Sequence, residues 1–424
     1  MYRWNGWDLL HKLGDMPKEA VEWLKGKKNT ILLENQLLGA AHRIRIKPSA
    51  LEAAKRRLGW KHGFGGNITG KESAASLSSS EKALVERIRR DTHANNRNNV
   101  TRTASYLRLY REQPELHWAF LAHMVSRNGG WCMTDLKGEL LPYLLNAEQR
   151  EHVFLFLERA NALIFQDAYP QLLLYQASRR AGRPLFHLLP SFHVSAFMRP
   201  IWEVFWEYGD SALVTVGLVI NEQHYIEERV VQHPFFREKV LDTFFFTTQS
   251  VLQLNQVVFP YGETEGQRLR VAGLVLEDFN LLKERIEVGK KLYAILFGIP
   301  VVFEGARRFA FGKRHSGSRA DYWPHLYAAV RHQAPVPSGQ LKERLEGGEL
   351  RPGADPLYSP YLTSAWKDRE LAPIERGDWF KSLDVLNYVT DIDAPFSFEM
   401  THEHSFGLNK VELAVLAGDL LTKP

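Results

Sequence analysis

The amino-acid sequence predicts a mainly α protein: a multi-helix globular body with little β structure and a loop-rich C-terminal part. Apolar residues recur at helical spacing, between residues that start and stop helices, along most of the chain after residue 80. Only two segments, Arg268–Leu276 and Val301–Phe311, resemble strands. Residues 312–377 are dense in Pro, Gly and charged residues, which favours loops with short helices.

These patterns divide the chain into four regions. Residues 1–62 form a basic helical arm, and residues 63–80 are rich in Gly, Ser and Ala, which predicts a flexible linker. We expect a central helical domain over residues 81–311 and a loop-rich region over residues 312–424 that packs on it. Residues 1–71 hold 14 Lys and Arg against 6 Asp and Glu, a net +8, whereas the whole chain carries +5. The remainder therefore carries −3, and the positive charge belongs to the arm.

Local signals place the first helices of the central domain. Ser78 and Glu81 have the spacing of a capping box for a helix that follows them. Pro114 suits the first turn of a later helix, whose end is predicted at Gly129–Gly130. Thr134 would then be the N-cap of the next helix.

The remaining helices follow from apolar patterning. Residues 147–168 are apolar nearly all round, which is typical of a central helix. Further helices are expected near residues 192–208, 211–231, 235–257 and 277–297. The last one is amphipathic and runs from about Leu408 to Leu421.

Composition excludes several classes of protein. The first residues lack the apolar core of a secretory signal, and no apolar run reaches the ~18 residues of a membrane-spanning helix. A single cysteine, Cys132, excludes an internal disulfide and a cysteine-rich zinc site. It also suits a reducing compartment, so we expect a cytoplasmic protein without a transmembrane segment.

The most distinctive segment is residues 92–110, THANNRNNVTRTASYLRLY. If it is helical, one face carries Asn95, Asn99, Arg102, Tyr106 and Tyr110, a polar and aromatic stripe. Amides, a guanidinium and phenols offer the directed hydrogen bonds that a carboxylate, a phosphate or a polar ring requires. The alternative interpretation is that the asparagines break the helix and cap its neighbours.

A second polar cluster, residues 126–139, lies between two apolar helices. Its paired glycines allow close backbone approach, and its candidate binding residues are Arg127, Asn128, Asp135 and Glu139. Thr134 and Asp135 are equally good helix-start residues, which would explain them without a ligand. Cys132 is expected to be a buried small hydrophobe rather than a nucleophile.

Two further features suggest other functions. In an extended segment His402 and His404 would point to the same side and could ligate a metal, although no third ligand is evident. The basic arm combines Lys and Arg with Trp, a composition compatible with nucleic acid or an anionic membrane surface. Its Trp and Leu could equally pack on the body while the cations stay solvated.

One long stretch resembles a known family. Residues 98–141, NNVTRTASYLRLYREQPELHWAFLAHMVSRNGGWCMTDLKGELL, are similar to the signature of the YppC-like proteins of spore-forming bacilli, domain of unknown function 2515. The similarity continues through FQDAYPQLLLY, LVINEQHYIEERV and GKKLYAILF, which begin at residues 165, 218 and 289. The resemblance implies a bacterial cytoplasmic protein and brings no activity, cofactor or catalytic residue. Residues 1–70 lie outside it.

Three hypotheses follow from the sequence. The first is a polar pocket, formed where residues 95–110 meet residues 127–139, that binds a small anionic or polar ligand. The second is a non-enzymatic interaction protein that applies residues 1–71 to nucleic acid, a membrane surface or a protein partner. The third is a metal-dependent hydrolase using His402 and His404. The sequence identifies no cofactor and leaves open whether the protein is an enzyme.

Overall fold

The structure is a computed structural model that describes residues 30–62, 77–243, 246, 255–262, 269–331, 333–337, 340–371 and 377–421. It is mainly α-helical, as predicted. The principal helices are α2 (Pro48–His62), α3 (Ser79–Asn95), α4 (Asn99–Glu112), α5 (His117–Asp135), α6 (Leu141–Leu144), α7 (Ala147–Ala181), α8 (Met198–Tyr208), α9 (Ser211–Ile226), α10 (Pro234–Phe236), α12 (Leu282–Gly298), α13 (Pro300–Gly312), α14 (Leu362–Ala365) and α15 (Thr401–Leu421). Short 3₁₀ turns are η1 (Phe186–Phe192), η4 (Arg319–Asp321) and η5 (Leu383–Tyr388), and π turns are η2 (Glu227–Val231) and η3 (Arg237–Leu241).

The strands are few and short. β1 (Gln256–Tyr261) and β2 (Arg270–Val275) form an antiparallel pair in which Val258 lies opposite Gly273. The others have two residues each: β3 (Tyr327–Ala328) pairs in parallel with β6 (Leu357–Tyr358), and β4 (Leu345–Glu346) pairs with β5 (Glu349–Leu350). They are embedded in irregular chain, as the composition of residues 312–377 predicted.

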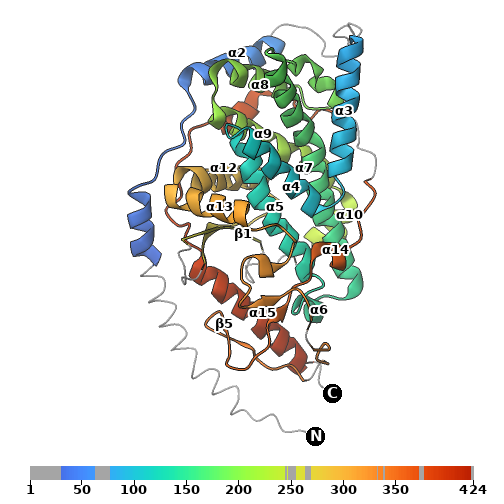
Figure 1. Ribbon diagram of the computed structural model, residues 1–424, viewed down its shortest axis with the longest axis vertical. Helices are drawn as coiled ribbons and strands as arrows, with labels where there is room; N and C mark the ends of the chain where they lie inside the picture. The colour runs from blue at the N-terminus through green and yellow to red at the C-terminus, as the bar shows by residue number, and fades with distance from the viewer. Residues whose placement is uncertain are drawn as a thin grey trace.

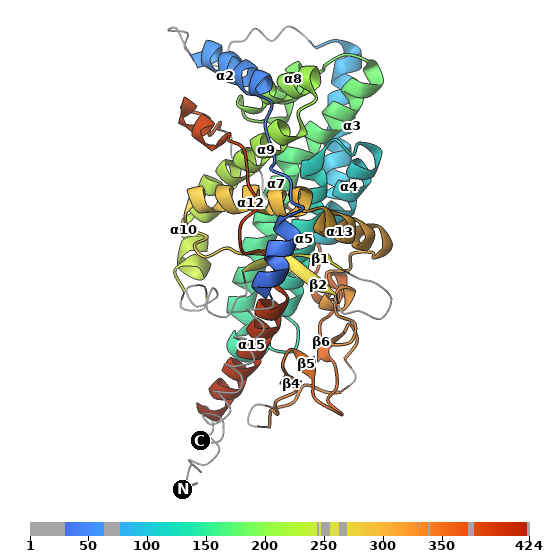
Figure 2. The same ribbon diagram turned by 90° about the vertical axis from the view of Figure 1, so that its left-hand side faces the viewer.

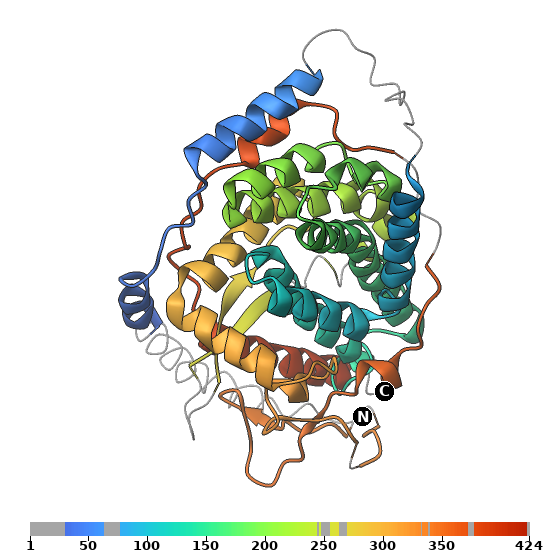
Figure 3. The ribbon, with the colours of Figure 1, turned by 45° about the horizontal axis from the view of Figure 1, so that its top comes forward.

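The molecule is elongated. Figure 1 shows α2 and α8 at one end, α5 and β1 near the middle, and α15 with the small strands at the other end. Figure 2, turned by 90°, shows α15 extending away from the helical body. In Figure 3 the teal helices α4 and α5 lie between the green α7–α9 and the orange α12 and α13. Helix α5 contacts α4, α7, α9, α12 and β1, and it is therefore central to the packing.

Asparagines divide the 92–110 segment into two helices. Asn96 is the C-cap of α3, and Asn98 is the N-cap of α4, where its side chain accepts a hydrogen bond from the Thr101 amide. The capping interpretation of these asparagines is thus confirmed, and one continuous helix is not formed. Asn95 ends α3, whereas the other four members of the predicted stripe lie on α4. The Ser78–Glu81 capping box is also confirmed.

The predicted helix end at Gly129–Gly130 is wrong, because α5 continues through both glycines to Asp135. Thr134 is consequently an internal residue of α5 rather than an N-cap. Gly130 is required by packing: a Cβ at this position would lie 2.6 Å from the His315 ring and 2.8 Å from the Asn99 side-chain oxygen. The glycine admits a neighbouring segment instead of ending the helix.

Three other expectations about elements are corrected. Val301–Phe311 is helix α13, not a strand; Pro300 occupies its first turn and Val302, Ala306 and Ala310 are buried at intervals of four. Of the helix expected over residues 235–257, the turns up to Leu241 are formed, residues 244–245 and 247–254 lie outside the described residues, and the predicted end is wrong because β1 begins at Gln256. The final helix starts at Thr401, seven residues before the predicted position. The strand predicted at 268–276 is confirmed as β2.

The described part of the N-terminal arm packs against the helical body. Helix α2 contacts α8, and its Ala50, Ala54 and Leu58 are buried in the main core. Arg57 pairs with Glu207 of α8 at 2.6 Å. Lys47 donates to the Tyr208 carbonyl at 2.6 Å. Residues 1–29 of the arm and 63–76 of the predicted linker lie outside the described residues.

A buried ion pair joins α4 to α7. The Arg102 side chain is 1% exposed and donates to Glu158 at 2.5 Å and to the Asn96 side-chain oxygen at 3.2 Å. The Glu158 side chain is 6% exposed. Removing one member of such a pair leaves the other charge in a medium that solvates it poorly.

Among the described residues, no helix is both long and apolar enough to cross a membrane.

We expect Arg102→Met to lower the free energy of unfolding by about 3–5 kcal/mol, because Glu158 would lose its buried partner. The double variant Arg102→Met/Glu158→Leu should recover much of that loss, since it removes both charges. Urea denaturation of the single and double variants measures the difference. A single variant as stable as the parent would show that this pair does not constrain the α4–α7 contact.

Adjacent glycines in α5 should respond oppositely to alanine. A Cβ at Gly129 makes only ordinary contacts, 3.5 Å or more from Asn161, so Gly129→Ala should stabilise the helix by about 0.5–1 kcal/mol. Gly130→Ala should destabilise by about 1–3 kcal/mol, because its Cβ overlaps the buried His315 ring. Thermal and urea unfolding measure the stability of the two variants. Equal changes in the free energy of unfolding would contradict the close approach of His315 to Gly130.

Candidate functional site

A cavity of about 310 Å³ lies between α5, α7, α9 and α12. Most of its wall is apolar, and the apolar side chains include Leu121, Ala122, Val125, Val153, Phe156, Leu157, Ala160, Ile164, Ile226, Val288 and Leu292. Several helices that are far apart in the sequence contribute, so no single stretch of sequence encodes the cavity. Its volume is at the lower end of the range of ~300–1,000 Å³ typical of small-molecule sites.

A carboxyl group lies in this apolar wall. Glu222 of α9 lines the cavity, and its Oε2 accepts a hydrogen bond from Trp118 Nε1 at 3.0 Å, while Oε1 accepts from the Gln223 amide at 3.2 Å. Burial raises the pKa of Glu222 to about 8, and the nearby Asp167 adds to the effect. The group is therefore largely protonated at neutral pH in the empty protein.

A second buried acid lies close to the first. Asp167 of α7 is 2% exposed, and its Oδ2 accepts hydrogen bonds from Asn221 and from Gln171, the latter at 2.8 Å. Oδ1 has no hydrogen-bond partner. Burial raises the pKa of Asp167 to about 7. Within the described parts of the chain, no Lys or Arg forms an ion pair with Asp167 or Glu222.

The Asp135–Arg319 ion pair also belongs to the cavity wall. Asp135 Oδ2 accepts from Arg319 Nε at 2.8 Å and from Nη2 at 2.7 Å, and the guanidinium lies over the Trp131 ring. Burial opposes the charge of Arg319, but the adjacent Asp135 more than offsets this and raises the pKa of the guanidinium above its ordinary value. A second, smaller hollow shares both residues.

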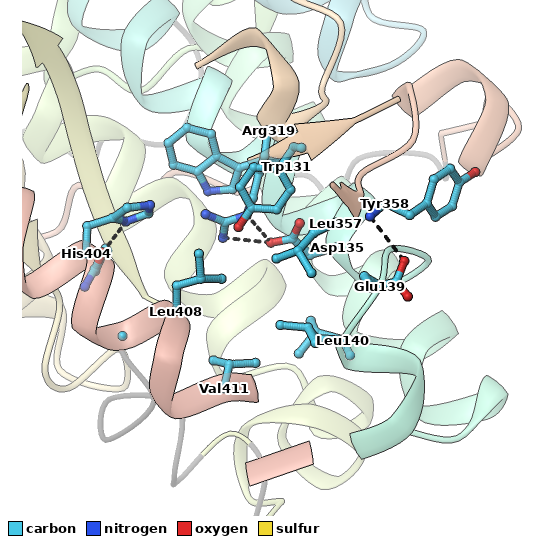
Figure 4. A pocket seen from close by; sticks show the side chains of 14 residues that line it. Trp131, Asp135, Glu139, Leu140, Arg319, Leu357, Tyr358, His404, Leu408 and Val411 are labelled. Atoms are coloured by element: carbon cyan, nitrogen blue, oxygen red, sulfur yellow. Dashed lines mark hydrogen bonds and ion pairs between the residues drawn. The ribbon is translucent and has the colours of Figure 1, made fainter. Parts of the chain in front are cut away.

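This smaller hollow measures about 60 Å³ and is lined by residues of α5, α15, β3 and β6. Figure 4 shows Arg319 pointing toward Asp135, with His404 on one side and Glu139 and Tyr358 on the other. His404 Nδ1 lies 2.9 Å from the Gln256 side-chain oxygen, and its ring stacks on Trp323. The carboxylate, guanidinium and imidazole groups of this hollow are thus each bonded to another polar group, and the hollow adjoins the larger cavity.

The predicted residues of the 92–110 segment are used mainly in bonds between elements. Asn95 donates to the Asp91 carbonyl and accepts from Ser105. Asn99 donates to the Ser126 carbonyl at 2.9 Å and lies 2.8 Å from His315 Nε2. Arg102 forms the ion pair described above. Tyr106 alone of the four lines the cavity.

The predicted residues of the 126–139 segment serve α5 as anchors. Arg127 donates to the carbonyls of residues 313 and 314, at 2.8 and 3.5 Å. Asn128 exchanges two hydrogen bonds with the backbone of Val258 in β1, and it also lines the cavity, as does Asp135. Glu139 lines the smaller hollow and accepts from Arg331, Arg344 and the Tyr358 amide.

The premise of the metal hypothesis is wrong, because His402 and His404 lie in α15 rather than in an extended segment. Residues two apart on a helix are separated by roughly 200° and do not share a face. Burial lowers the pKa of His404 to about 3, and its ring is held by Gln256 and Trp323. Among the described residues, no three His, Cys, Asp or Glu side chains cluster in a way that could hold a metal.

Sequence reasoning did not select Glu222 as a candidate. Asp167 was visible as an acid inside a helix that is apolar nearly all round, which marks a buried group. The sequence indicates the burial of Glu222 less clearly, because this residue comes after the apolar run of α9 and before further acids, as a solvent-exposed residue would. Cys132 also lines the cavity; burial raises the pKa of its thiol to about 12, so it is not a thiolate at neutral pH.

Comparison with known proteins identifies the family. The model of a family described as "Protein of unknown function (DUF2515)" matches residues 94–405. The "Uncharacterized protein YppC" of Bacillus subtilis (strain 168) is 42% identical over 240 residues, which cover 57% of this chain and 73% of the relative. No solved structure matches the chain. The chain therefore belongs to the DUF2515 family, as its resemblance to the YppC-like proteins implied.

Proposed function

We propose that this protein binds a small, mostly apolar molecule in the cavity between α5, α7, α9 and α12. The observation that carries the proposal is the cavity itself: about 310 Å³, with an apolar wall interrupted by a few polar groups. Such walls bind the body of a ligand by burial, while sparse polar groups fix its orientation.

The cavity is partly open to solvent, so a ligand can enter it and bury its apolar body against the wall. A molecule that binds the native state in this way would stabilise the fold by mass action.

The proposed ligand differs from the anionic or polar one expected from the sequence. Of the predicted binding residues, only Tyr106, Asn128 and Asp135 line this cavity, and Asn128 and Asp135 already bond to other parts of the protein. An anion in the cavity would also lie near the acids Glu222 and Asp167.

We place the protein in the cytoplasm, a proposal that its single cysteine supports.

Filling the cavity from α5 tests this proposal. Ala122 lines the cavity, so Ala122→Phe should occupy part of its volume and weaken binding of the neutral apolar dye N-phenyl-1-naphthylamine by about tenfold or more. Fluorescence titration of the dye measures the affinity, and circular dichroism checks that the variant remains helical.

Ala104→Phe is the matched control, because Ala104 is an exposed residue of the neighbouring helix α4. The control should bind the dye as the parent does. Failure of the parent to bind the dye, or equal binding by Ala122→Phe and the parent, would refute the proposed site.

A further inference from the structure

We propose that the ligand of this cavity carries a cationic amine that pairs with the Glu222 carboxylate; this inference rests on the proposed function and specifies its ligand class. The carboxyl lines a cavity whose other walls are largely apolar. A ligand with an apolar body and an ammonium head group would match both parts.

The hydrogen bonds of Glu222 leave room for another donor. A carboxylate has about four acceptor sites, and the Trp118 indole and the Gln223 amide supply one donor each. Both of these partners are neutral N–H donors. When Glu222 is ionised, they orient the carboxylate without neutralising its charge, so a cation can still pair with it.

The cations of the cavity wall and its surroundings are already paired elsewhere, among them Arg319, which is held by Asp135. Arg285 of α12, which also lines the cavity, donates to Glu227, to Gln223 and to the Phe279 carbonyl. Arg102 of α4 is held by Glu158 of α7. None of these is therefore available to neutralise Glu222.

The other titratable groups around Glu222 favour a cation as well. Asp167 of α7 is a second acid, and its charge acts on Glu222. Tyr106 of α4 is fully protonated, since burial raises its pKa well above the ordinary value. Arg229, in the turn after α9, lowers the pKa of Asp167 but donates to the backbone carbonyls of Tyr225 and Gly377. The charge of Arg229 thus acts on Asp167, whereas no described Lys or Arg forms an ion pair with Glu222.

Aromatic side chains add a second attraction. Tyr106 and Trp118 both line the cavity and pack edge to face, with ring centroids 5.4 Å apart. Phe156 and Phe279 form another such pair in the same wall, 5.5 Å apart. Aromatic faces attract ammonium groups, more strongly where water is excluded.

Proton competition gives the proposal a distinct signature. In the empty protein the pKa of Glu222 is about 8, so below pH 8 a cation must displace a proton before it can pair with the carboxylate. For a permanently charged ligand, affinity should fall about tenfold per pH unit below pH 8 and level off above it. A neutral ligand should show no such trend.

The experiment compares benzyltrimethylammonium with its neutral isostere neopentylbenzene, each as a competitor of N-phenyl-1-naphthylamine from pH 6 to 9. We expect the cation to displace the dye at least about tenfold better than the isostere at pH 9, and to lose this advantage toward pH 6. Glu222→Gln should abolish the preference and its pH dependence while leaving displacement by the isostere unchanged.

Glu228→Gln, at an exposed acid in the turn after α9, is the control and should behave as the parent. Equal displacement by both competitors at every pH, or a cation preference that survives in Glu222→Gln, would overturn the inference while leaving the apolar site intact. Absence of dye binding to the parent would instead refute the proposed function itself.

Discussion

The second half of α5 is the constraint on which the rest of the structure depends. Within nine residues, Arg127 donates hydrogen bonds to the carbonyls of residues 313 and 314, and Asn128 bonds to the backbone of β1. Gly130 leaves space for the His315 ring, and Asp135 forms an ion pair with Arg319. Thr134 also donates to the Gly317 carbonyl. These bonds tie residues 313–319 and strand β1 to the helical body. They explain why so polar a stretch lies inside a protein: its side chains satisfy backbone groups that would otherwise be buried without partners.

The same arrangement separates polar from apolar surfaces around α5. One part of the helix bonds to irregular chain, whereas Leu121, Ala122 and Val125 line the cavity together with side chains of α7 and α9. The cavity therefore lies against a helix whose position is fixed by hydrogen bonds and an ion pair. Such support keeps a binding site open at a cost in stability that a ligand can offset. Asp167 is buried beside this cavity, and Glu222 lines it.

Local physics explains which parts of the fold were predictable. Capping at Ser78 and Asn98 and the start of the central helix α7 depend on residues close in sequence, and these predictions hold, although α7 continues to Ala181, beyond the predicted residues 147–168. The continuation of α5 through Gly129–Gly130 depends on His315, far along the chain, which nothing local reveals. Likewise α13 contains Val and Phe residues of the kind that favour strands, yet its burial follows a helical spacing. The cavity was beyond sequence reasoning because four distant helices build it, and Glu222 gains its meaning only from their packing.

The central claim is that a largely apolar cavity lies between α5, α7, α9 and α12. Crystallography under xenon pressure tests it most directly, since xenon enters apolar cavities that water leaves empty. The account predicts xenon density beside Ala122 and Phe156, reduced in a crystal of Ala122→Phe. A cavity filled by side chains or by a chain of ordered water molecules, with no xenon, would contradict it.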